Sequence, residues 1–311
     1  MSGTSGMSGT VGASGASAMN VTGRASRHRP DQGAVRSPTP IGTALGRAVR
    51  FESRQLTSLR STGVLVSVVG LLSCANGLGI GFDGGEAVPA ADSVTDALQF
   101  APVSMQLPLI ALVIFVFGAG SVTVEFSRGA ARTTWLVAGS RGVAFAAKIA
   151  VGAAAGAGLA LGCTLLGVTV GAVTLGIRGV GQPDWGTTFP PLLRYLVVMG
   201  CWPVIAVSTA ALIRNRVGTA LVLVLWPLLG ERLAGITLGM VPGLGGIADW
   251  LPFGAARAAM LVAEPTGQDA GFVRSLVGTD LTPGTGLLVF CVFAAVLACA
   301  GAYVYGRRDA P

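Results

Sequence analysis

Long stretches without a charged side chain are the feature that most constrains this chain. Charged residues make up 11% of its 311 residues, and hydrophobic residues make up 52%. A soluble domain carries about 25% charged residues, and about 20 apolar residues are enough to cross the hydrocarbon layer of a membrane as a helix. The sequence therefore predicts an all-α integral membrane protein.

The apolar stretches predict six transmembrane helices, which lie at about residues 61–82, 101–124, 149–177, 194–213, 217–238 and 284–306. The fifth stretch is interrupted, because Glu231 and Arg232 follow its first apolar run and a second run continues to residue 248. Two interpretations stay open for it. Residues 217–238 form one helix, or residues 217–248 form two half-spans that re-enter from one side.

The basic residues favour six spans with both termini in the cytoplasm, because Lys and Arg concentrate in cytoplasmic segments. With six spans, the basic residues that remain outside are Arg178, Arg194, Arg232, Arg257 and Arg274. Seven spans would also place Arg307 and Arg308 outside. An even number of spans therefore fits the charges better, with residues 307–311 as a cytoplasmic C-terminus.

The segment before the first span has two parts. Residues 1–42 are rich in Ser, Gly and Ala, a composition that predicts a disordered cytoplasmic tail. Residues 43–60 predict an amphipathic helix on the membrane surface, with an apolar stripe and an opposite basic face directed at lipid headgroups. The apolar stripe consists of Leu45, Val49, Leu56 and Leu59, and the basic face consists of Arg47, Arg50 and Arg54.

Glu52 interrupts the apolar stripe of this surface helix. It either meets a partner there or lies at the rim and reaches back to water.

In the third span, pairs of glycines four residues apart predict close approach of helix backbones, in a tightly packed bundle or a dimer seam. These pairs are Gly152 and Gly156, Gly158 and Gly162, and Gly167 and Gly171.

Residues that most enzymes need are missing from the sequence. His28 is the only histidine and Lys148 the only lysine, and Lys148 is followed by Ile149 rather than by the Ser or Thr of a P-loop. We therefore expect no catalytic site, no metal, no cofactor and no ATP hydrolysis in this chain. The basic charge lies between apolar runs and does not form a soluble basic patch, so nucleic acid is not an expected partner.

The predicted loop at residues 125–148 carries a pattern of acidic, basic and small residues: Glu125, Arg128, Gly129, Arg132, Thr133, Thr134, Arg141, Ala147 and Lys148. Three other stretches accompany it, namely Glu52 to Thr62, Leu251 to Gly254 and Tyr305 to Ala310. In this order the sequence resembles permease subunits of type-2 ABC exporters of the kind common in actinobacteria. Two departures are Gln55, where the family has Lys, and Gly139, where Pro is expected.

The resemblance implies that residues 61–306 form a six-helix permease domain in a bacterial cytoplasmic membrane. It also implies a coupling loop that docks on a separate ABC ATPase subunit, and a second permease copy, identical or different. The candidate coupling residues are Glu125, Arg128, Arg132, Arg141 and Lys148. The plainer interpretation of these basic residues is positive-inside anchoring. The exported molecule would be small or amphipathic, and the sequence does not name it.

Polar and aromatic groups at membrane depth are candidates for a transport pathway. In this chain they are Asn76, Trp202, Trp226 and Glu231. Glu231 has a second interpretation, in which it simply lies at the outer interface. Another class of protein stays open: a structural or regulatory membrane protein without a pathway. A membrane-embedded enzyme is disfavoured, because the only acids predicted on the cytoplasmic side are Asp31, Glu52, Glu125 and Asp309.

Overall fold

The computed structural model describes residues 41–58, 60–83, 87–99, 111, 138–213, 215–262 and 270–307. These residues belong to one compact unit, Pro40–Pro311. In this part of the chain all regular secondary structure is helical. The first half contains α1 (Ile41–Ser58), α2 (Arg60–Asp83), α3 (Ala91–Gln99) and α6 (Arg141–Arg178).

The second half begins with α7 (Trp185–Ile213) and α8 (Arg216–Leu225). A π-helical segment, η1 (Trp226–Gly230), leads directly into α9 (Glu231–Met240). Three short helices and one long helix complete the chain: α10 (Gly245–Ala248), α11 (Pro252–Met260), α12 (Ala270–Val277) and α13 (Pro283–Arg307).

Five helices of the described structure are long and apolar enough to cross a membrane: Thr62–Phe82, Arg141–Arg178, Trp185–Ile213, Val217–Met240 and Pro283–Arg307. The predicted all-α membrane fold is confirmed at this level, and the protein is a multi-pass membrane protein. Of the predicted spans, only 101–124 lies outside the described residues, apart from Ala111, which is buried in the core.

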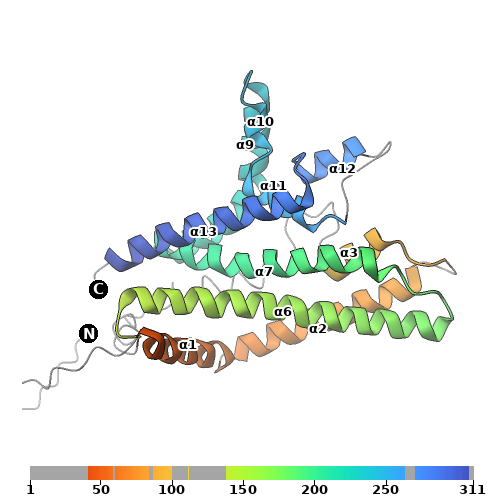
Figure 1. Ribbon diagram of the computed structural model, residues 1–311, viewed down its shortest axis with the longest axis horizontal. Helices are drawn as coiled ribbons and strands as arrows, with labels where there is room; N and C mark the ends of the chain where they lie inside the picture. Colours follow the sequence, from red (N-terminus) through yellow and green to blue (C-terminus); the bar gives the residue numbers. More distant parts are fainter. Residues whose placement is uncertain are drawn as a thin grey trace, which may run out of the picture. The chain divides into compact units, whose positions relative to one another are not determined.

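The ambiguous fifth stretch is continuous in the structure, since α8, η1 and α9 follow one another without a break. A π-helical segment disturbs the hydrogen-bond ladder and is a common cause of bends in helices. Here the segment also contains Pro227, which has no backbone N–H to donate. Beyond it, α9 and α10 stand out from the long helices (Figure 1).

The long helices pack side by side in the order α2, α6, α7 and α13 (Figure 1), and α1 lies against α6. Some of the paired glycines make this packing close. A Cβ atom at Gly156 would lie 2.5 Å from the carbonyl oxygen of Met199 on α7, and one at Gly167 would lie 2.7 Å from Leu98 on α3. Gly158 and Gly162 have no such neighbour within 4 Å, so this pair does not serve packing within the described structure.

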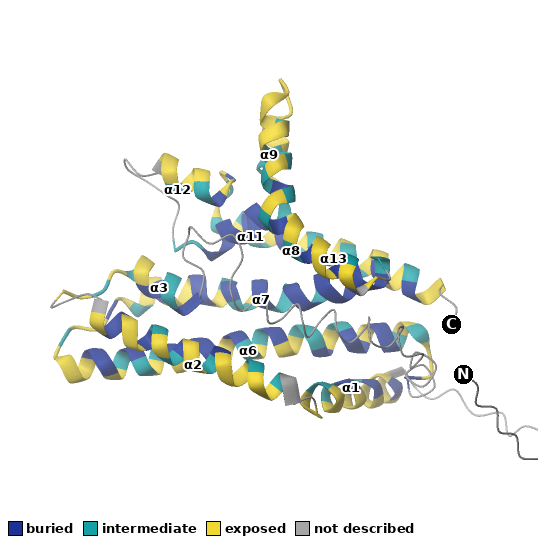
Figure 2. Ribbon diagram, turned by 180° about the vertical axis from the view of Figure 1, so that it is seen from behind, coloured by how far each residue is buried: buried dark blue, intermediate teal, exposed yellow. Residues whose placement is uncertain are grey.

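One short helix is buried along almost its whole length. Every residue of α11 from Phe253 to Met260 is buried, although the helix has only nine residues. It packs against α7 and α13 (Figure 2), and Phe253 stacks on Trp202 of α7 with ring centroids 5.1 Å apart. The ends of so short a buried helix need partners for their free N–H and C=O groups.

Candidate functional site

A buried ion pair joins α1 to α6. The Nζ atom of Lys148 lies 2.6 Å from Oε1 of Glu52, and the two side chains are 1% and 5% exposed. Charged groups are rarely buried unless they are paired and hydrogen-bonded. Glu52, which interrupts the predicted apolar stripe, therefore meets a partner and does not reach back to water.

The face of α1 that contacts this end of α6 is narrower than the predicted stripe. Its buried residues are Ala44, Ala48 and Glu52, which are spaced four apart on one side of the helix. Leu45, placed on the predicted stripe, is 36% exposed. Small alanines allow α1 to lie close to α6, and this closeness brings the carboxylate within reach of Lys148.

The same end of the molecule includes the start of α6 and the last turns of α7 and α13. Ser140 caps α6 by accepting the backbone N–H of Val143. The Phe145 and Tyr305 rings lie 5.2 Å apart, and Arg141 donates to the carbonyl oxygen of Gly306 at 3.3 Å. Buried alanines of α1, α6 and α7 fill the space around these contacts. We call this group of residues the α1–α6 junction.

The predicted coupling residues are only partly described. Arg141 and Lys148 lie in the α1–α6 junction, whereas Glu125, Arg128 and Arg132 lie outside the described residues. Arg47, Arg50 and Arg54 are all exposed on α1, on the side away from the buried alanines. This arrangement leaves a basic face free at the same end as the ion pair.

Glu231 occupies a second buried polar site, at the N-terminus of α11. Its side chain is 2% exposed, and its Oε2 atom accepts the backbone N–H of Phe253 at 2.7 Å. Its Oε1 atom accepts the N–H of Gly254 and lies 3.4 Å from Nη2 of Arg257. A carboxylate at a helix N-terminus is stabilised both by the free N–H groups and by the helix dipole.

The opposite end of α11 is capped by cationic and amide side chains. Arg194 of α7 donates to the carbonyl oxygens of Ala259 at 2.8 Å and Leu261 at 2.6 Å. Gln99 of α3 donates to the carbonyl oxygen of Met260 at 3.1 Å. The helix therefore has an anion at its positive end and a cation at its negative end, each supplied by another helix.

Arg257 links α11 to the C-terminal end of α12. Its Nε atom donates to the carbonyl oxygen of Val277 at 2.8 Å, and its Nη1 atom is buried without a hydrogen-bond partner in the described structure. Burial lowers the pKa of Arg257 from its ordinary value, and the nearby Glu231 carboxylate opposes this shift. Arg257 was not predicted as a partner of Glu231; its only signal in the sequence is a lone charge inside the apolar run PFGAARAAM.

The four candidate pathway residues do not form one site. Trp202 packs in an aromatic cluster with Phe253 and Phe290, and Phe253 also contacts Glu231. Trp226 lies in η1 and is 48% exposed. Asn76 lines a separate groove between α2 and α3. In the described part of the chain, Trp202 and Glu231 are thus brought to α11, and the other two lie elsewhere.

Metal binding and known relatives give no further assignment. Among the described residues, no group of three or more His, Cys, Asp or Glu side chains lies close enough together to hold a metal ion. No protein-family model matches the sequence, and no curated protein matches it.

Proposed function

We propose that this protein is the permease subunit of a type-2 ABC exporter in a bacterial cytoplasmic membrane. It would span the membrane six times with both termini in the cytoplasm, and it would assemble with a second permease and with separate ABC ATPase subunits. It would export a small or amphipathic molecule, while the partner subunits hydrolyse ATP. The observation that carries the proposal is the buried ion pair between Glu52 and Lys148.

One member of this ion pair, Lys148, is the last residue of the segment that resembles a coupling loop. Residues 125–148 end at Lys148, and Lys148 is bound to the surface helix α1. A force on the loop would therefore reach both α1 and the start of α6, because the buried pair and its alanine packing hold the two helices together. Such a rigid connection is what a partner subunit needs to move spanning helices as a body.

The course of the chain supports the sixth span. Gln99 donates to the carbonyl oxygen of Pro191 near the start of α7, whereas Ala138 is buried in the α1–α6 junction. These two places are at opposite ends of the long helices (Figure 1). The apolar run at 101–124 has the length for a crossing between these two ends, which is what the proposed sixth span requires.

The basic residues at one end of the long helices support the proposed orientation. Arg47, Arg50, Arg54 and Arg141 lie at the end where α6 begins, and α13 ends there with Arg307. The positive-inside rule places this end in the cytoplasm. Both the coupling loop and the C-terminus would then face the ATPase.

Purification from the native membrane in mild detergent tests the partner. We expect an ABC ATPase to co-purify in stoichiometric amount with the tagged wild-type chain, and to be lost from the Arg128→Glu/Arg132→Glu double variant. Arg274→Glu is the matched control, because Arg274 is a half-exposed arginine far along the chain, next to Asp280. This control should retain the ATPase.

Reconstitution in vesicles tests transport itself. We expect ATP-dependent flux of an amphipathic dye from vesicles that contain the copurified complex. If repeated preparations contain the permease alone, with no nucleotidase and no flux, the proposal fails and the structural or regulatory alternative takes its place.

A further inference from the structure

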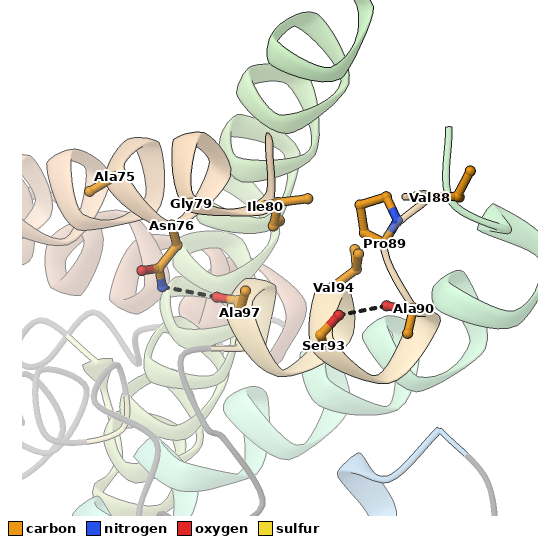
Figure 3. Close-up of a pocket in the computed structure, with 10 residues that line it drawn as sticks. All are labelled: Ala75, Asn76, Gly79, Ile80, Val88, Pro89, Ala90, Ser93, Val94 and Ala97. Carbon is orange, nitrogen blue, oxygen red and sulfur yellow. Dashed lines mark hydrogen bonds between the residues drawn. The ribbon is translucent and has the colours of Figure 1, made fainter. Parts of the chain in front are cut away.

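A groove between α2 and α3 has the size of a small-molecule site (Figure 3). Its volume is about 470 Å³. Pockets for small ligands commonly range from about 300 to 1,000 Å³ and are mostly apolar, with a few polar groups that orient the ligand. The groove lies away from both the α1–α6 junction and the α11 caps, so neither of these sites accounts for it.

The floor of the groove is rigid and apolar. Ile80 and Val94 line it, and both are buried in a hydrophobic cluster shared by α2, α3 and α6. Gly79 lines it as well, and no heavy atom lies within 4 Å of the place where its Cβ would be. The missing side chain of Gly79 therefore leaves part of this space open.

Two polar side chains line the groove, and each already donates one hydrogen bond. Asn76 donates from Nδ2 to the carbonyl oxygen of Ala97 at 2.9 Å, and Ser93 donates from Oγ to the carbonyl oxygen of Ala90 at 2.9 Å (Figure 3). What remains on these side chains is one N–H of the Asn76 amide and acceptor capacity, at Oδ1 of Asn76 and at the lone pairs of the serine oxygen. None of the described residues that line the groove is charged.

We propose that this groove binds an uncharged amphiphile that carries a hydroxyl group on a single apolar chain. The apolar body would lie on Ile80, Val94 and Gly79, and the hydroxyl would donate to Oδ1 of Asn76. A neutral headgroup fits better than a charged one, because the described lining supplies no opposite charge to replace the hydration of an ion. The further statement that this amphiphile is the exported molecule rests on the proposed function.

Photolabelling tests the binding directly. The purified chain in phospholipid nanodiscs is exposed to a photoactivatable decanol with a diazirine on its alkyl chain, and the labelled peptides are mapped by mass spectrometry. We expect label on the α2 and α3 residues that line the groove, and we expect excess decanol to abolish it. Label spread along the exposed face of α2, without competition by decanol, would show ordinary lipid contact and overturn the proposal.

Two glycine variants on the same helix sharpen the test. Gly79→Leu places a side chain in the groove, and we expect it to lower the competed label at least tenfold. Gly63→Leu is the matched control, because Gly63 is also on α2 with no heavy atom within 4 Å of its Cβ position, yet it does not line the groove. At both positions a Cβ atom would have open space around it, and undiminished label in Gly79→Leu would contradict the proposal.

The role of the hydroxyl has its own comparison. The methyl ether of decanol has the same chain but no hydrogen to donate, so we expect it to compete several-fold less well than decanol. Equal competition would overturn the assignment of a donor headgroup at Asn76.

Binding and export can fail separately. Competed label in a protein that shows no ATP-dependent flux would support the groove and contradict the proposed function. Loss of label in Gly79→Leu with undiminished decanol export would support the groove and overturn the statement that its ligand is the cargo.

Discussion

Two buried ion pairs in the described part of the chain are built differently. In the pair Glu52 and Lys148, the charged atoms are 2.6 Å apart and the side chains bind each other directly. In the pair Glu231 and Arg257, the charged atoms are 3.4 Å apart. There the carboxylate also accepts two backbone N–H groups, and the guanidinium also donates to a backbone carbonyl.

The first pair joins two helices through their side chains, whereas in the second pair each side chain also caps backbone groups at the end of a helix. At the α1–α6 junction, the contact joins two side chains of opposite charge, and through this contact the backbone does not fix which helix carries which charge. At α11, the sign of each charge is fixed by the backbone, because N–H groups need an acceptor and C=O groups need a donor. An exchange of the two charged residues should therefore be tolerated at the first site and not at the second.

The largest effect is expected from Lys148→Met, which removes the cation that lies 2.6 Å from the buried Glu52 carboxylate. Removal of one member of a buried pair costs about 3–5 kcal/mol. Thermal unfolding in detergent should show a large loss of stability, and the exchanged variant Glu52→Lys/Lys148→Glu should regain most of it. If the exchanged variant is as unstable as Lys148→Met, then attraction between opposite charges is not enough, and the particular placement of each side chain is needed to hold α1 against α6.

Glu231→Gln should have the next largest effect. The amide keeps one acceptor oxygen but presents N–H groups to the second backbone donor, and an unsatisfied buried donor costs about 1–3 kcal/mol. Here the exchange Glu231→Arg/Arg257→Glu should not restore the unfolding temperature. A restored temperature would mean that α11 is held by the ion pair after all. Flux per folded molecule should equal that of the wild-type complex, because Glu231 acts as a helix cap.

Arg194→Met tests the other cap of α11. The methionine keeps the apolar volume near the helix but removes the donors to Ala259 and Leu261. A favourable charge at a helix terminus contributes about 0.3–2 kcal/mol, so we expect a moderate loss of thermal stability. Hydrogen exchange of the backbone N–H groups of α11 should speed up more than that of α1. Equal protection in both helices would contradict a local capping role.

The smallest effect is expected from Arg141→Met at the α1–α6 junction. One of the interactions of Arg141, its hydrogen bond to the carbonyl oxygen of Gly306, is 3.3 Å long and exposed, and such a bond contributes about 0.5–1.5 kcal/mol. The unfolding temperature should change by much less than in Lys148→Met. A loss of thermal stability as large as that of Lys148→Met would mean that the end of α13 also helps to hold α1 against α6.

The sequence predicts the class of fold because charge and hydropathy act locally. Apolar runs bounded by arginines indicate helices such as α2, α6 and α13 without any knowledge of their neighbours. The interruption of the stripe marks Glu52 as unusual, but it leaves two interpretations open, a partner within the stripe or a return to water. The partner itself is not readable, because Lys148 lies 96 positions away along the chain and the pairing depends on how α1 packs against α6.

The buried position of α11 could not be predicted for a similar reason. A run of nine residues is too short to read as a span, and its burial depends on caps supplied by α3, α7 and α9. The assembly of these four elements is a tertiary property. The same holds for the groove at Asn76, because a single polar residue in α2 does not indicate that α3 will stand beside it.

The length of α6 has a mechanical consequence. Its 38 residues make it about 57 Å long at about 1.5 Å per residue, whereas the hydrocarbon layer is about 30 Å thick. The helix must therefore tilt, thicken the bilayer around it or extend beyond it. Lys148 lies near one end of this rod, so the thickness of the surrounding membrane sets how far α1 can approach the lipid surface. In a thinner bilayer, α6 would tilt further from the membrane normal, and this tilt would strain the contact between Glu52 and Lys148.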